Sequence, residues 1–196
     1  ALGVRCQHCH VGEEGKPIDT FDFVSDEKQT KQTARVMLQM VQAVNNEHLA
    51  KVPLRSAPPI KVSCLTCHHG QERPRLLEDV LQEAITAQGV AAGIAEYREL
   101  REKYYGGFAF DFNEGTLARL AQQLQMEKKN GEALAVLKLN VEFYPNSEMS
   151  YFQMAELYLA KGEKAAAIEH YKKSLELNPQ NGRAKRRLEE LEKQAK

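Results

Sequence analysis

The chain has 196 residues, which is room for one domain of ordinary size or two small ones. Its 27 Lys and Arg residues balance its 27 Asp and Glu residues, so no bulk charge favours binding to nucleic acid or to an anionic membrane. No apolar run approaches the roughly 18–20 residues of a membrane span, and no secretory signal precedes the first cysteine.

The first recognisable feature is a cysteine motif, Cys6-Gln7-His8-Cys9-His10, in a stretch up to about residue 25 that is expected to be irregular. A C-x-x-C-H run is the attachment signature of c-type haem. Its two thiols add across the haem vinyl groups, and the adjacent histidine reaches the iron as the proximal ligand. The motif therefore predicts one covalent haem, with Cys6 and Cys9 as attachment points and His10 on the iron.

A helix is predicted next, starting near Ser25 or Asp26, either of which could cap it, and running to about Asn46. One face of this helix carries apolar residues at helical spacing: Val36, Met37, Met40, Val41 and Val44. Residues 51–60 contain three prolines and are predicted to form a loop that leads into the next motif.

The second motif, Cys64-Leu65-Thr66-Cys67-His68, repeats the first pattern, so the two copies use all four cysteines. It predicts a second covalent haem on Cys64 and Cys67, with His68 as proximal ligand. Zinc sites have their C-x-x-C pairs about 15–20 residues apart, much closer than these two pairs. A thioredoxin-like site needs one motif in a βαβ context, and a disulfide framework leaves both histidines unexplained. Two haem c groups are the favoured interpretation.

Residues 76–105, beyond Pro74, are predicted to be helical with a break at Gly89. Two apolar stripes support this prediction: Leu77, Val80, Leu81 and Ile85 in the first, and Ile94, Tyr97, Leu100 and Tyr104 in the second. The glycine-containing stretch 104–108 should end the helix and mark a boundary.

The last third of the chain contains an internal repeat. Pro145 and Pro179 are separated by the tetratricopeptide (TPR) period of about 34 residues. The signature positions of the second repeat are Tyr151, Met154, Ala155, Tyr158, Gly162, Ala167, Tyr171 and Ser174. The signature positions of the first repeat, which fits the pattern less closely, are Leu117, Leu120, Ala121, Leu124, Ala133 and Leu137. A charged helix with a narrow stripe of Ala184, Leu188 and Leu191 should cap the stack. Because such stacks usually need about three units, the preceding helices are expected to complete the packing.

The predicted fold class is all-α. Residues 1–74 should form a small di-haem cytochrome c domain with long loops. Residues 75–112 should form connecting helical hairpins. Residues 113–196 should form a TPR-like α-solenoid of two repeats plus a capping helix.

Residues 3–73 resemble the first two haem segments of the cytochrome subunit of photosynthetic reaction centres. The matching segments are residues 3–10, 34–40 and 62–70. In that family a helix ahead of the attachment motif supplies a methionine as the sixth iron ligand. The resemblance thus implies Met37 as the distal ligand of the second haem, with Met40 as the fallback and ordinary helix core as the alternative role.

The distal ligand of the first haem is an open question. The family pattern would place its methionine ahead of Cys6, where the short stretch in this chain holds none. The alternatives are His48, His69, His8 or a neighbouring molecule. In the family, a histidine between the helix methionine and the second motif ligates a more distant haem, and His48 lies in that interval. Its alternative role is an exposed loop residue, while His8 and His69 are expected to pack beside the haems.

The whole architecture also resembles exported bacterial cytochromes with a C-terminal repeat domain. It implies an electron-transfer protein of the periplasm or cell exterior, working with redox partner proteins and docking or self-assembling through its TPR domain. Neither an enzyme activity nor a nucleic-acid partner is expected. One alternative is a homopolymer that conducts electrons as an extracellular filament. Another is a di-haem peroxidase, for which no accompanying acid or base is evident.

Overall fold

The computed structural model describes residues 2–53 and 60–194, which consist of helices joined by turns and loops. The all-α prediction is confirmed: in these ranges the strand-like pairing is a single isolated bridge between Val11 and Asp22. The chain divides into two compact units, residues 1–74 with 107–109 and residues 75–106 with 110–196. None of the helices in the described part of the chain has the length and apolar character that a bilayer crossing requires.

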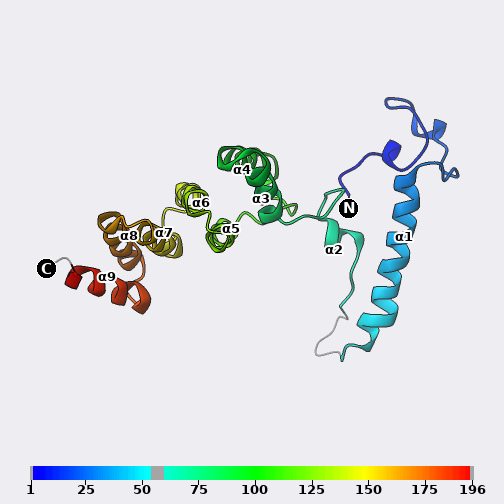
Figure 1. Cartoon of the computed structure of the whole chain (residues 1–196). Coiled ribbons are helices and arrows are strands. Elements are labelled where there is room, and N and C mark those ends of the chain that lie inside the picture. The colour runs from blue at the N-terminus through cyan, green and yellow to red at the C-terminus, as the bar shows by residue number, and fades with distance from the viewer. Residues whose placement is uncertain (1, 54–59, 195–196) are drawn as a thin grey trace. The chain divides into compact units, whose positions relative to one another are not determined.

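The first unit contains little regular structure (Figure 1). Its helices are α1 (Gln29–Ala43), which continues as a π-helical turn (Val44–His48), and the short α2 (Cys64–His68). Of the predicted loop at 51–60, residues 54–59 lie outside the described ranges. Among the described residues, all the buried apolar side chains belong to the second unit, and the buried side chain of the first is Lys31. Within the described ranges, protein side chains therefore give this unit no buried apolar core.

The predicted start of the first helix, near Ser25 or Asp26, is wrong because α1 begins at Gln29. The carboxylate of Asp22 accepts hydrogen bonds from the amides of residues 24 and 25, both at 2.8 Å. These two hydrogen bonds, Ser25 first, lower the pKa of the Asp22 carboxyl. The local turn that they form holds the backbone away from a helical path, so the helix starts later.

The buried Lys31 anchors the loop ahead of α1. Its ammonium donates to the carbonyl oxygens of Phe23, Val24 and Ser25 at 2.7, 3.1 and 2.7 Å. It also lies 3.2 Å from a carboxylate oxygen of Asp26, and this contact lowers the pKa of that carboxyl. The charge is tolerated inside the unit because every donor has an acceptor.

Replacing Lys31 by methionine should destabilise the first unit by about 2–3 kcal/mol, because three backbone carbonyls would lose their donor. The measurement is urea unfolding of the complete chain, followed by circular dichroism. The matched control is Lys16→Met, which changes an exposed lysine of the same unit. Equal unfolding midpoints for the two variants would contradict the anchoring role.

The second unit is a series of helices, which follow one another in Figure 1 from green to red. They are α3 (Leu77–Gln88), α4 (Val90–Tyr104), α5 (Glu114–Met126), α6 (Asn130–Phe143), α7 (Glu148–Ala160), α8 (Lys164–Leu177) and α9 (Gly182–Gln194). The predicted break at Gly89 is confirmed, because this residue separates α3 from α4 with a φ of 88°. The two predicted TPR-like repeats correspond to the helix pairs α5–α6 and α7–α8, which α9 follows.

Two apolar clusters hold the helices of the second unit together. The larger one joins α3 and α4 to α5, α6 and α7, and its fully buried members include Leu81, Tyr97, Leu120 and Leu137. The smaller one joins α7, α8 and α9: Phe152, Ala155, Ala167, Tyr171, Ala184 and Leu191. The prediction that the middle helices complete the repeat stack is confirmed.

Tyr171 should make the second unit sensitive to alkaline pH. Its hydroxyl donates to the carboxylate of Glu156. Burial, and then this hydrogen bond, raise the pKa of Tyr171 far above its ordinary value of 10.0. The unfolded chain therefore releases this proton at a lower pH than the folded chain. The protonated hydroxyl of Tyr171 therefore stabilises the folded chain fully below about pH 10. This stabilisation is lost as the pH rises above that value.

We expect the thermal midpoint of the second unit to fall above pH 10, and to fall less steeply in Tyr171→Phe than in wild type. Circular dichroism melts across this pH range provide the measurement. Tyr105→Phe, which removes the hydroxyl of a 63% exposed tyrosine, is the control. If the thermal midpoint depends on pH identically in all three proteins, the prediction is wrong.

Candidate haem-binding site

The first motif folds into a single helical turn, Cys6–His8. The amides of Cys9 and His10 donate to the Cys6 carbonyl oxygen at 3.2 and 3.0 Å. Both thiols are free, that of Cys6 exposed and that of Cys9 half-buried. The imidazole of His10 packs on the ring of Phe23, with ring centroids 4.6 Å apart. This turn keeps two accessible thiols beside a positioned histidine, which the attachment chemistry needs.

The second motif forms α2 and is capped by its own residues. The amide of Ser63 donates to the hydroxyl of Thr66 at 3.0 Å, and the two hydroxyls lie 3.2 Å apart. A Ser or Thr pair in these positions satisfies amides at a helix start that would otherwise lack acceptors. Thr66, between the two cysteines, thus stabilises the turn that carries them. The thiol of Cys64 is half-buried and that of Cys67 is exposed, and both are free.

The orientation of His68 suits an iron ligand. Its Nδ1 lies 3.0 Å from the carbonyl oxygen of Gln71. A carbonyl only accepts, so Nδ1 carries the proton and Nε2 keeps its lone pair for a metal. Such a hydrogen bond fixes the ring and raises the basicity of the ligand. The side chain of Gln71 in turn donates to the Ala109 carbonyl. Sequence reasoning missed Gln71 because the group that it offers to His68 is a main-chain carbonyl oxygen.

His10 is held differently from His68. Its Nδ1 is buried and has no hydrogen-bond partner among the described residues. The contact with Phe23, rather than a carbonyl, positions this ring. Phe23 is a second residue that sequence reasoning missed. The feature of the sequence that could have indicated it is the nearby Phe21, with which its ring pairs in the structure. The two proximal histidines therefore have unequal surroundings.

The other histidines of the first unit differ in how far their ring nitrogens are engaged. Both nitrogens of His69 lie against carbonyl oxygens, Nδ1 3.0 Å from Phe108 and Nε2 2.7 Å from Thr66. His8 Nε2 lies 3.7 Å from a carboxylate oxygen of Glu72. His48 is exposed and ends the π-helical turn after α1, a kind of turn that is frequent at functional sites. His48 as a distal ligand stays a prediction.

Helix α1 and its π-helical turn connect the two motifs. At the start of the helix, Lys28 Nζ and Thr30 Oγ1 donate to the carbonyl oxygens of residues 7 and 8. Beyond its end, the side-chain amide of Asn45 exchanges two hydrogen bonds with the main chain of Val62, at 2.8 and 2.9 Å. One end of the helix is therefore attached to the first motif and the other to the segment just ahead of the second.

Met37 lies midway along this bridging helix. It follows Thr30 by about two turns and so projects from the same face of α1. Met37 is half-buried, whereas Met40 is 45% exposed. Ligation of the second haem by Met37, with Met40 as the fallback, stays a prediction.

The structure brings the two attachment segments together. Glycine is required at position 3, because a Cβ there would lie 2.2 Å from the carbonyl oxygen of Gly70. The contact between His8 and Glu72 joins the same two segments. Motifs that are far apart in the sequence are thus neighbours in the first unit.

The residues present fit covalent haem. Large apolar side chains around the motifs and along α1 are exposed, such as Val36 (63%), Leu65 (55%) and Leu38 (54%). Apolar surface of this kind marks a place that another group covers. The zinc alternative has no geometric support, since no three His, Cys, Asp or Glu side chains in the described ranges come close enough to share an ion.

Comparison with known proteins agrees with this chemistry. The family model for the photosynthetic reaction centre cytochrome C subunit matches residues 1–163. The tetratricopeptide repeat model matches residues 149–181. The prediction of a TPR repeat is thereby confirmed for residues 149–181.

Two curated proteins are similar to parts of the chain. Cytochrome c-554 of Chloroflexus aurantiacus is 39% identical over 69 residues, which are 35% of this chain and 14% of that protein. Anaphase-promoting complex subunit 7 of Arabidopsis thaliana is 32% identical over 82 residues, which are 42% of this chain and 14% of that protein. The matched segment is thus a small part of either relative.

Proposed function

This chain belongs to the family of the photosynthetic reaction centre cytochrome c subunit, and from that membership we propose that it binds two haem c groups and transfers electrons. Its redox partners are other proteins, which it meets through the TPR-like repeats. The site of action is the periplasm or the cell exterior, because c-type haem attachment is completed outside the cytoplasm.

The lack of an apolar core in the first unit carries the proposal. Among the described residues, the buried apolar side chains all lie at Leu77 or beyond. The first unit instead exposes apolar side chains on α1 and beside the second motif. A segment of this size needs buried apolar surface, a metal or a covalent cross-link to stay folded. Two large apolar groups bound through four thioether bonds would supply that surface.

Each proposed ligand has a defined role. Cys6 with Cys9, and Cys64 with Cys67, bind the two haems covalently, and His10 and His68 hold the irons. Met37 is the distal ligand of the second haem, and His48 serves the first haem or the haem of a neighbouring molecule. Haem iron supplies a one-electron couple whose potential depends on its axial ligands. With both axial positions of an iron occupied by side chains, no open site would remain for peroxidase chemistry.

The neighbouring attachment segments support electron exchange within the chain. Gly3 beside Gly70, and His8 beside Glu72, join the main chain around one motif to that around the other. The polypeptide would thereby hold both haems in one unit at a constant separation. A filament of stacked copies is the alternative assembly, and sedimentation of the purified protein tests it: a stable monomer would remove the filament.

Haem content tests the proposed function. Intact mass and the alkaline pyridine spectrum should show two covalent haems per chain, and a potentiometric titration should show two one-electron transitions. A single haem, or haem released by acid and organic solvent, would overturn the proposal.

A further inference from the structure

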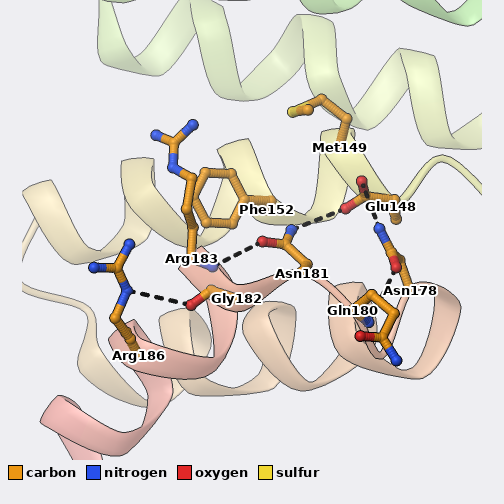
Figure 2. Close-up of a pocket in the computed structure, with 9 residues that line it drawn as sticks. All are labelled: Glu148, Met149, Phe152, Asn178, Gln180, Asn181, Gly182, Arg183 and Arg186. Carbon is orange, nitrogen blue, oxygen red and sulfur yellow. Dashed lines mark hydrogen bonds between the residues drawn. The ribbon is translucent and has the colours of Figure 1, made fainter.

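The second unit contains a groove between α7 and α9 (Figure 2). Met149 and Phe152 of α7 line one side, and Arg183 and Arg186 of α9 line the other, around a pocket of about 700 Å³. A smaller pocket of about 290 Å³ shares Phe152, Arg183 and Arg186 and reaches Glu156 on α7. The two pockets form one groove, in which Met149 is 46% exposed and Phe152, whose ring lies beneath Arg183, is 6% exposed.

Two arginines of this groove have no carboxylate partner among the described residues. The guanidinium of Arg183 lies 5.1 Å from the centroid of the Phe152 ring. Arg186 donates to the carbonyl oxygen of Gly182 at 3.4 Å. The next arginine is different, because Arg187 pairs with Glu156 at 3.2 Å and with Glu190 at 3.6 Å. Two guanidinium groups in the pocket that Met149 also lines are therefore available to an acidic ligand.

The one carboxylate of the larger pocket is occupied. Glu148 accepts hydrogen bonds from Asn181 at 3.1 Å, Ser174 at 3.2 Å and Asn178 at 3.4 Å. Figure 2 shows its carboxylate turned toward the two asparagines, at the opposite end of the pocket from Arg186. Its repulsion of an acidic ligand is thus weakest where the arginines lie.

We propose that this groove binds an acidic segment of a partner protein that also carries an apolar side chain. Arg183 and Arg186 would pair with its carboxylates, since a guanidinium offers two parallel donors to a carboxylate. The apolar side chain would lie on Met149, which is 46% exposed. The inference rests on the proposed function, in which the repeats dock partners, and adds the chemistry by which a partner is recognised.

The charges around the groove favour an acidic peptide over nucleic acid. A phosphate backbone needs a continuous basic track, because its affinity comes from neutralising many successive charges. Here the lining of the groove also includes Glu148, Glu156 and Glu190, which interrupt the basic residues. Such a site fits a few discrete carboxylates.

Fluorescence anisotropy with the complete haem-loaded chain tests the proposal. The probe is a short fluorescein-labelled peptide of glutamates with a central leucine pair, and the control peptide has glutamine in place of glutamate. We expect binding that weakens with added salt, and at least a roughly tenfold loss of affinity in the double variant Arg183→Gln/Arg186→Gln. Met149→Ala should weaken binding without changing its salt dependence.

The matched control is Lys185→Gln/Lys138→Gln, which removes the same charge from two exposed lysines outside the groove. Equal affinity in both double variants, equal affinity for the glutamine peptide, or no binding would overturn the proposal. If the wild-type chain forms a dimer and the double arginine variant is monomeric, the groove binds a second copy of the chain. That result would also overturn the proposal. Haem content and redox titration of the same samples show separately whether the proposed function stands.

Discussion

Replacing Cys64 and Cys67 by alanine should remove one of two covalent haems and leave the other attached. The four thiols are free, and the two pairs belong to two separate helical turns, so each pair should bind a different haem. The remaining haem should be bound at Cys6 and Cys9. Intact mass of the chain and of its proteolytic fragments measures both the number of haems and their positions.

The same variant should also lose much of the structure of its first unit. That unit has no buried apolar side chain of its own among the described residues, so each haem would supply a large part of its apolar packing. We expect rapid proteolysis within residues 1–74, while the separate apolar clusters keep the second unit resistant. The matched control is Cys6→Ala/Cys9→Ala. Two haems remaining in either variant would refute the assignment.

Replacing Met37 by alanine should abolish the His/Met spectroscopic signature of the second haem and lower its reduction potential. Methionine ligation raises the potential of a haem above that of a bis-histidine site, so loss of the sulfur should shift the potential downward. Magnetic circular dichroism of the ferric protein detects the methionine ligand, and potentiometry measures the shift.

Met40→Ala is the matched control, because it removes the same side chain one turn later on α1. Thr30, which bonds to the first motif, precedes Met37 by about two turns and so lies on the same face of α1. Met40 is 45% exposed, whereas Met37 is half-buried. A signature that survives in Met37→Ala and disappears in Met40→Ala would exchange the two roles.

Several features of the site are invisible in the sequence for one physical reason. The acceptor for His68 is the main-chain oxygen of Gln71, and every residue type carries such an oxygen. Lys31 looks like an ordinary surface lysine until the fold places three carbonyl groups around it. For the same reason the start of α1 was predicted too early, because the turn at Asp22 competes with helix capping.

By itself, the sequence determined the features that depend on local chemistry and periodicity. Each C-x-x-C-H motif specifies its chemistry within five consecutive residues. The break at Gly89 follows from the conformational freedom of one residue, and the TPR period follows from the length of a helical hairpin. Such signals need no knowledge of distant contacts.

Only the tertiary structure decided what the chain brings together from distant segments. It placed Gly3 against Gly70 and attached α1 and its π-helical turn to the segments around both motifs. It also left Arg183 and Arg186 without carboxylate partners among the residues that the structure describes. Whether a charge is paired, or an apolar side chain is covered, depends on the packing of one element against another. Residue type and spacing along the chain carry no record of that packing.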